Sequence, residues 1–416
     1  MADLEAKETQ VTSRERIVSA MRHSESDRVP IDLGGMRSTG IHVKAYRKLA
    51  DYLGYCDLPV RVFDVHQMLA FVDEEIRREV HSDAIELKRL NGGFGTRIDS
   101  WKGRDIFDDG SRYLFPDGFD PKAKEDGSLV IERDGVEVAT MPRGGHYFDR
   151  SYFPLAHAGR KEEISALVLP RLTGEEIAFL KAQLTGIRES TDCAVIGAFG
   201  GNFLEAGHSM FGYQEFMERL ITDRSLMEFF LDRLLETYLV DLEKYLSALG
   251  DDIDIIQIGD DYGTQENTAI SPRIFRSIFK PRLKILCDFI HRKKSDLYIF
   301  LHSCGSVYTF IPDFIEVGVQ ILNPVQTNAK NMEPERLKNE FGRDIVFWGG
   351  GCDTQHVLPF GTLEDLEEDI RRRIDIFSPG GGFVFSPIHN IQAEVPPEKI
   401  FRLFECAYEY GSDNTR

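Results

Sequence analysis

A histidine and a cysteine two residues apart suggest the start of a metal site. The run 301-LHSCGSV-307 places His302 and Cys304 at the end of an apolar stretch and just before a glycine. In an extended strand, residues i and i+2 point to the same side, so the imidazole and the thiol would face one point. Imidazole nitrogen and thiolate sulfur are ligands that zinc accepts. The alternative is a histidine that closes a buried strand beside a cysteine that fills the core.

A second cysteine provides a candidate third ligand. Cys352 follows Cys304 by 48 residues, a separation that fits two strand–helix units and allows the two thiols to converge. A catalytic zinc site has three protein ligands and keeps a fourth position open. We therefore predict a site of His302, Cys304 and Cys352. Two thiolates and a neutral imidazole would balance the charge of Zn²⁺ and keep a bound substrate thiolate nucleophilic.

Two adjacent aspartates and one arginine are further candidates for catalysis or substrate binding. Asp260 and Asp261 could act as acid and base, could bind substrate N–H groups, or could cap a helix in a solvated loop. Consecutive residues of a strand point apart, so we expect one of the two, and not a shared-proton pair, to work in the site. Arg37 could bind a substrate carboxylate or phosphate, or could pair with an acidic neighbour.

The elements that must position these residues are strands that alternate with helices along the chain. Short apolar runs that end in polar or glycine residues alternate with amphipathic stretches such as 213–249, 272–293 and 363–377. Eight buried parallel strands that alternate with helices predict an α/β fold, a (β/α)8 TIM barrel formed by residues 1–416 as one domain. The predicted strands are 29–33, 84–87, 194–199, 254–258, 297–301, 319–323, 345–349 and 383–387.

One region interrupts this alternation after the second predicted strand. Residues 92–153 are rich in glycine, aspartate and aromatic residues, and they alternate apolar and polar positions around Asp-Gly pairs. That pattern predicts an insertion of β-hairpins. The insertion could cover the barrel mouth, or it could be a surface meander without a functional role.

Barrel enzymes carry their chemistry at the carboxyl ends of the strands, so polar residues just after each apolar run are candidates for the site. Leaving such groups buried and unpaired would cost about 1–3 kcal/mol each, which favours a mouth that faces a substrate. The predicted catalytic residues are Asp260, Asp261 and His389. The predicted substrate-binding residues are Arg37, Glu205, Asn323, Gln326 and Gln355.

Composition narrows the class of partner. Asp and Glu number 69 against 50 Lys and Arg, a net charge of −19, which argues against nucleic acid or an anionic membrane as partner. No apolar segment has signal-peptide or membrane-spanning length, and six scattered cysteines do not form a disulfide framework. We expect a cytoplasmic protein.

Five segments of the chain can be compared with known protein families: 14-RERIVSAMRHSESDRVPIDLGG-35, 260-DDYGTQ-265, 301-LHSCGSVYTFIPDFIEVGVQILNPVQ-326, 347-FWGGGCDTQHVLP-359 and 380-GGGFVFSPIHNIQAEVPPEKI-400. Together they resemble the uroporphyrinogen decarboxylase superfamily. The resemblance implies a (β/α)8 barrel and one of two activities. One branch decarboxylates a tetrapyrrole without metal, and the other moves methyl groups between corrinoid proteins and thiols, amines, alcohols or ethers at a zinc site.

The resemblance favours the methyltransferase branch. The decarboxylases carry an Arg-Gln-Ala-Gly-Arg-Tyr segment after the first strand, whereas this chain has 34-GGMRSTGIH-42 with Arg37 alone. The methyltransferases carry a His-x-Cys and a later third cysteine, which His302, Cys304 and Cys352 match. In the thiol-methylating members the last cysteine follows the eighth strand, where this chain has His389. The third ligand is therefore either Cys352 or His389.

We thus expect a zinc-dependent methyltransferase that moves a methyl group between a small substrate (ether, alcohol, amine or thiol) and a corrinoid protein or a thiol acceptor. The resemblance implies zinc, and a corrinoid carried by a partner protein, as cofactors. The alternatives are a metal-free decarboxylase of a carboxylated tetrapyrrole and a non-enzymatic corrinoid carrier. The chain lacks the Asp-x-His-x-x-Gly run of corrinoid-binding modules, which disfavours the carrier. Methyl transfer could run in either direction. The protein could form a homodimer.

Overall fold

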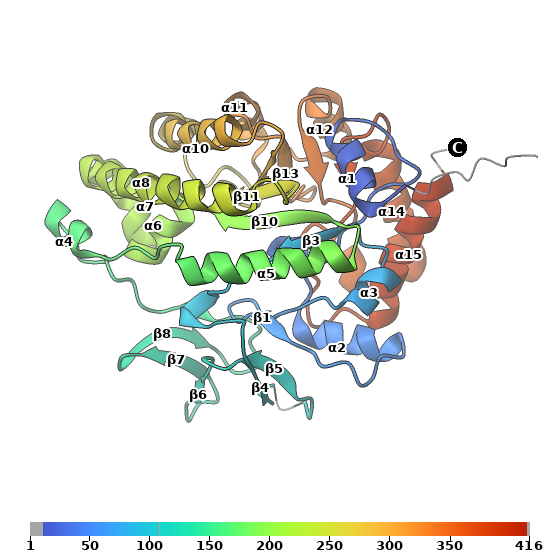
Figure 1. Cartoon of the computed structure of the whole chain (residues 1–416), viewed down its shortest axis with the longest axis horizontal. Coiled ribbons are helices and arrows are strands. Elements are labelled where there is room, and N and C mark those ends of the chain that lie inside the picture. The colour runs from blue at the N-terminus through green and yellow to red at the C-terminus, as the bar shows by residue number, and fades with distance from the viewer. Residues whose placement is uncertain (1–10, 108, 414–416) are drawn as a thin grey trace, which may run out of the picture.

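A computed structural model describes residues 11–107 and 109–413, and these residues form the predicted barrel. Neighbouring strands of the sheet run parallel, and their order around it follows the chain. Helices surround the strands, as Figure 1 shows. The strands are β3 (Ala84–Leu87), β10 (Ala194–Gly200), β11 (Ile255–Gly259), β12 (Tyr298–His302), β13 (Ile321–Asn323), β14 (Val346–Trp348) and β15 (Phe383–Val384).

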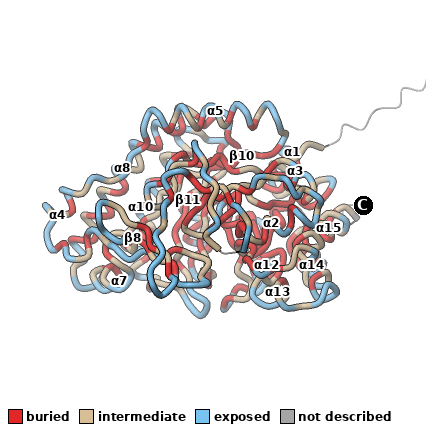
Figure 2. The backbone as a smooth tube through the Cα atoms, turned by 90° about the horizontal axis from the view of Figure 1, so that it is seen from below, coloured by how far each residue is buried: buried red, intermediate tan, exposed pale blue. Residues whose placement is uncertain are grey.

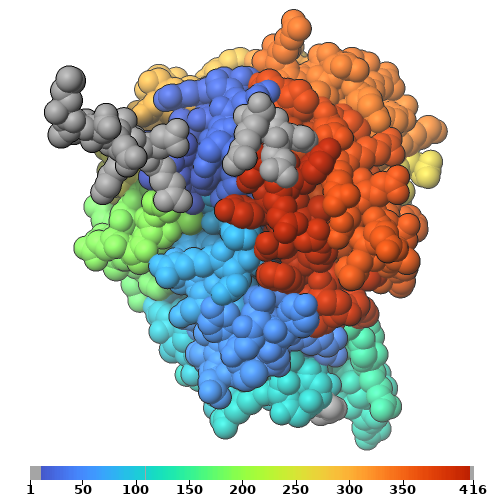
Figure 3. All heavy atoms as spheres, turned by 90° about the vertical axis from the view of Figure 1, so that its right-hand side faces the viewer, coloured from blue at the N-terminus to red at the C-terminus, as the bar shows by residue number. Residues whose placement is uncertain are grey.

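The first predicted strand, residues 29–33, occupies the eighth position and closes the ring. Ile31 forms a parallel bridge with Phe385, beyond the end of β15. The N–H of Asp32 donates to the carbonyl of Phe385 at 2.8 Å, and on the other side the N–H of Asp83 donates to the carbonyl of Ile31 at 2.7 Å. Segments near the two ends of the chain therefore lie side by side, which Figure 3 shows in blue and red.

The helices pack against the outside of the barrel through their apolar faces. Figure 2 shows that buried residues concentrate in the centre and that exposed residues follow the outer turns. The predicted helix 213–249 is divided at Asp223 into two helices. The helices are α1 (Ser13–Met21), α2 (Val43–Tyr52), α3 (Glu74–Glu79), α4 (Lys161–Ala166), α5 (Gly174–Ser190), α6 (Leu204–Phe211), α7 (Tyr213–Thr222), α8 (Arg224–Leu249), α9 (Pro272–Ile274), α10 (Lys280–Lys293), α11 (Ile311–Val317), α12 (Pro334–Phe341), α13 (Val357–Phe360), α14 (Leu363–Phe377) and α15 (Pro397–Asp413).

The β-rich insertion lies between β3 and α5. It is built from two antiparallel sheets, and its Asp134–Gly135 turn has φ angles of 51° and 78°, which suit a tight hairpin. Figure 1 shows the insertion on one side of the barrel. Its strands are β4 (Trp101–Arg104), β5 (Tyr113–Pro116), β6 (Lys122–Ala123), β7 (Leu129–Arg133), β8 (Val136–Met141) and β9 (Asp149–Arg150); a short pair, β1 (Val62–Asp64) and β2 (Leu69–Ala70), precedes β3.

Within residues 11–107 and 109–413, every helix is too short or too polar to cross a membrane. The opening stretch of the chain, on which the expectation about a signal peptide rests, lies largely outside the described residues.

Candidate metal centre

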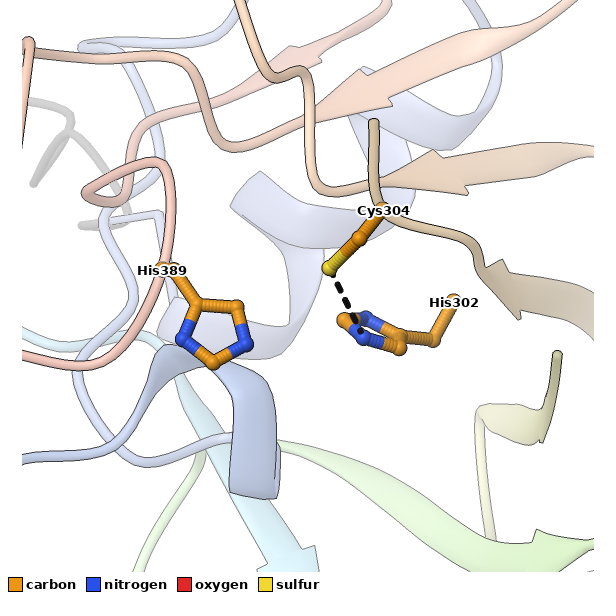
Figure 4. Close-up of side chains that lie close together, drawn as sticks. All are labelled: His302, Cys304 and His389. Atoms are coloured by element: carbon orange, nitrogen blue, oxygen red, sulfur yellow. Dashed lines mark hydrogen bonds between the residues drawn. The ribbon is translucent and has the colours of Figure 1, made fainter. Parts of the chain in front are cut away.

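Two imidazoles and one thiol converge at the carboxyl end of the barrel. His302 is the last residue of β12, Cys304 follows in the next loop, and His389 lies in the loop after β15. One potential ligand atom from each lies within 4.8 Å of the other two. Figure 4 shows the three side chains directed toward one another, with the Cys304 Sγ 3.5 Å from the His302 Nε2. The geometry supports a three-ligand metal site.

The side chain of Asn323 fixes the orientation of His302. Its Oδ1 lies 2.8 Å from the His302 Nδ1, and because an amide oxygen only accepts, that nitrogen carries the proton. When the ring is neutral, the lone pair of Nε2 is therefore directed toward Cys304. Asn323 is itself held by Ser38, whose hydroxyl donates to Oδ1 at 2.7 Å, and by the carbonyl of Trp348, which accepts from Nδ2 at 2.9 Å. Such a second contact is typical of metal-binding histidines.

The loop that carries Cys304 is fixed by Asp261 and by close backbone packing. The N–H of Cys304 donates to the Asp261 Oδ1 at 2.8 Å, and the same oxygen is 3.6 Å from the His302 Nε2. Gly305 has a φ of 84°, and a Cβ there would come within 2.4 Å of the Gly263 backbone. A glycine is required at this position because L side chains avoid positive φ and the space is filled.

Burial keeps the Cys304 thiol and the His389 imidazole uncharged when no cation is present. It raises the pKa of the Cys304 thiol well above its usual value, and the nearby Asp261 and Glu205 carboxylates raise it further. Burial, with a contribution from His302, lowers the pKa of His389 to about 4. His389 is thus neutral at physiological pH and free to bind a metal. The thiol would become a ligand only by losing its proton to a bound cation.

A cavity of about 360 Å³ opens beside these residues. Its basic groups are already paired: Arg37 with Asp64 at 3.3 Å, Lys88 with Glu86 at 2.7 Å and Arg89 with Glu176 at 2.6 Å. Among the described residues, Glu205 and Asp261 form no ion pair with a lysine or arginine. Burial and the Asp261 charge raise the pKa of Glu205. The lining includes His302, His389, Arg37, Asp64, Glu86, Lys88, Arg89, Glu205, Asp261, Phe63 and Phe199.

Cys352 does not join the group. Of the two alternatives for the third ligand, Cys352 and His389, the structure brings only His389 close to His302 and Cys304. Cys352 is fully buried, and the charged groups that act on its thiol, Asp369 and Arg373, belong to α14. Gly349 and Gly350 have φ angles of 104° and 77°, and they break the alternation of side chains after β14. The thiol therefore packs outside the barrel mouth and fills the core.

Asp260 is a structural residue, which corrects the prediction that placed it among the catalytic groups. It is 1% exposed, and its carboxylate accepts the N–H groups of Phe203, Leu204 and Glu205 at 2.6, 2.7 and 2.8 Å. These amides form the start of α6, so Asp260 binds a helix N-terminus. Burial and the Glu205 charge raise its pKa to about 8, although the amides act in the opposite direction. Asp261, its neighbour, faces the cavity.

The remaining predicted residues divide between the cavity and its supports. Arg37 and Glu205, two of the predicted substrate-binding residues, line the cavity. Asn323 is fully buried and orients His302, so it supports the site without facing a substrate. Gln326 braces the cysteine loop by accepting the N–H of Gly305 at 2.8 Å. Gln355 is exposed on the loop after β14 and does not line the cavity.

Sequence reasoning missed the polar groups that follow the second strand. Glu86, Lys88 and Arg89 lie at the end of β3 or just beyond it, and all three line the cavity. The rule that identified the other candidates, polar residues at strand ends, applies to them too. Because the β-rich insertion follows directly, these residues were not recognised as polar groups at a strand end.

Comparison with known proteins identifies the family. The family model for uroporphyrinogen decarboxylase (URO-D) matches residues 132–410, and no curated protein matches the chain. Xylanase 10B from Thermotoga maritima has a TM-score of 0.39 at 10% identity, over 63% of this chain and 85% of the xylanase. An endo-1,4-beta-xylanase from Caldicellulosiruptor owensensis has a TM-score of 0.33 at 11% identity, over 59% and 88%. The chain belongs to the uroporphyrinogen decarboxylase family.

Proposed function

We propose that this protein is a zinc-dependent methyltransferase that works with a small methyl donor or acceptor and with a corrinoid protein as partner. The observation that carries the proposal is the approach of His302, Cys304 and His389 to within 4.8 Å of one another. Three such ligands, with a cavity beside them for a further group, match the composition of catalytic zinc sites. The family contains decarboxylases and methyltransferases, and the ligand set favours the second.

The charge of the three ligands also indicates which kind of small substrate the site favours. Two neutral imidazoles and one thiolate leave one positive charge on Zn²⁺, whereas the predicted set with two thiolates would leave none. A zinc ion held by this set would supply Lewis acidity to a substrate oxygen. We therefore favour a methyl ether or an alcohol over a thiol as the small substrate. Methyl transfer to a cobalt(I) corrinoid would leave the electron pair of the broken C–O bond on that oxygen.

Three residues around the ligands have roles that fit the proposed methyl transfer. Glu205 lines the same cavity, and burial raises its pKa, so its carboxyl can hold a proton for the oxygen that loses the methyl group. Asp261 holds the cysteine loop by accepting the N–H of Cys304, and the same carboxylate oxygen lies 3.6 Å from the His302 Nε2. Asn323 keeps the proton of His302 on Nδ1.

The cavity suits a tetrapyrrole polycarboxylate poorly. Four carboxylates, Asp64, Glu86, Glu205 and Asp261, face it, and its three basic groups are already paired with acidic ones. A substrate with many carboxylates would meet repulsion that the arginine and lysine side chains do not compensate. This disfavours the decarboxylase alternative.

Metal analysis and a methyl-transfer assay test the proposal together. Protein purified without chelators should contain about one zinc, and Cys304→Ser and His389→Ala should lose it while Cys352→Ala retains it. Methyl transfer from a panel of methyl ethers and alcohols to cob(I)alamin is followed by the change in the corrinoid absorption spectrum. Wild-type protein without zinc, or full activity in the two ligand variants, would contradict the proposal.

A further inference from the structure

The insertion contacts the loop that carries His389. The Tyr147 hydroxyl donates to the Gln392 Oε1, and the His146 Nε2 lies 2.5 Å from the Glu394 Oε1. Gln392 and Glu394 follow His389 by three and five residues. Two adjacent side chains of the insertion thus bind the same short loop, which we call the His389 loop (residues 389–394).

The contact with Tyr147 is relayed to the residue next to His389. Gln392 donates from Nε2 to the carbonyl of Asn390 at 2.9 Å, so it joins the insertion to the backbone beside His389. Asn390 in turn accepts the N–H of Gly40 at 2.9 Å and donates to the Gln67 Oε1 at 2.6 Å. Because these bonds converge on Asn390, the placement of the His389 backbone depends on them.

The insertion end of the contact is anchored by its own core. Phe148 is fully buried and packs edge-to-face against Phe119 at 5.8 Å between ring centroids and against Phe94 at 6.4 Å. Its N–H donates to the carbonyl of His66 at 3.0 Å. Tyr147 and His146 therefore cannot move far unless the insertion itself moves.

We propose that Tyr147 and His146 are positioning residues through which the insertion holds the His389 loop, so that His389 completes the metal site. This inference rests on the proposed metal-dependent function. It gives the insertion a role that the sequence left open: the third ligand depends on an element outside the barrel, whereas His302 and Cys304 are held by the barrel itself. Any ligand or partner that displaces the insertion would also displace His389.

The expected size of the effect follows from the distance of these contacts from the metal. Removing a group that orients a metal ligand typically weakens metal binding about 10–100-fold. Tyr147 acts through Gln392 and Asn390, so we expect the lower end, about a tenfold faster release of zinc. Tyr147→Phe removes only the hydroxyl and leaves the ring packing intact. Glu394→Gln removes the charge from the second contact on an exposed side chain.

The experiment compares full-length wild type, Tyr147→Phe, Glu394→Gln and a matched control, Tyr113→Phe. The Tyr113 hydroxyl donates to the Asp109 Oδ2 at 2.8 Å within the insertion and does not touch the His389 loop. Zinc release to a chromogenic chelator gives the rate. The absorption spectrum of cobalt(II)-substituted protein reports the ligand geometry. We expect faster release and an altered spectrum in the first two variants, and wild-type behaviour in Tyr113→Phe.

A second measurement does not depend on metal. In the metal-free protein the Ile391 amide, which donates to the Gly40 carbonyl at 3.0 Å, should exchange its hydrogen faster in Tyr147→Phe than in wild type. Equal exchange and equal zinc release would overturn the inference, as would an equally large effect in Tyr113→Phe. A wild type that binds no zinc but shows the exchange difference would refute the proposed function and leave the positioning of the loop supported.

Discussion

Zinc binding to the metal-free protein should release one thiol proton, from Cys304. Burial raises the pKa of both the Cys304 and the Cys352 thiol well above the usual value, so both are protonated near pH 7.5. A metal binds the thiolate, so each cysteine ligand must give up its proton. His389, with a pKa of about 4, has none to release at this pH. The number of thiol protons therefore counts the cysteine ligands.

The size of the pH dependence of zinc affinity follows from the same protonation states. Because the thiol pKa lies above the pH, the affinity for zinc should rise with pH, tenfold or about 1.4 kcal/mol per pH unit for each thiol proton displaced. A site with two cysteines would have twice that dependence. Cys352→Ala should keep the wild-type slope and affinity. Cys304→Ser should release one proton fewer and bind zinc at least about 100-fold more weakly, since it loses a ligand itself.

Isothermal titration calorimetry in two buffers of different ionisation enthalpy measures the protons released. Comparison between variants at one pH cancels protons from other sources, such as Glu205 or a zinc-bound water. The reasoning is refuted if Cys352→Ala releases one proton fewer than wild type and binds zinc more weakly. In that case the thiol of Cys352 must turn toward the site when metal binds.

Four further substitutions test residues in and around the site. Asn323→Ala should weaken zinc binding about 10–100-fold, because the His302 ring loses the acceptor that orients it; equilibrium competition with a chelator measures this. Asp260→Ala leaves three helix amides without their acceptor, at about 1–3 kcal/mol each, and should lower the free energy of unfolding by several kcal/mol in urea titrations, whereas Asp261→Asn should change it by less than about 1 kcal/mol. Glu205→Gln should slow methyl transfer about 100-fold and leave the zinc content unchanged; an unchanged rate would exclude Glu205 as proton donor.

The strands could be predicted closely because buried parallel strands read as continuous apolar runs. The predicted strand 84–87 coincides with β3, and the predicted run 297–301 differs by one residue from β12. His302 and Cys304 were identified because one lies on a strand and the other just after it. The position of the site at the strand ends followed from the barrel itself.

The direction of side chains in the loops could not be predicted. Alternation applies only while the backbone is extended, and glycines with positive φ end it before Cys352. Asp260 and Asp261 are equivalent in sequence, and only the position of α6 decides which carboxylate binds its amides. Both corrections depend on contacts between segments distant in the chain, which a local pattern does not contain.

The way in which the ring closes has a consequence for synthesis of the chain. Ile31 pairs with Phe385, so the last side of the ring cannot form until the chain as far as Phe385 has left the ribosome. Until then the nascent sheet has an unpaired edge, and such edges recruit strands from other molecules. Contacts between residues so far apart also make folding slow. Partly synthesised chains of this protein should therefore depend on chaperones until the C-terminal strand arrives, and chains truncated before Phe383 should aggregate.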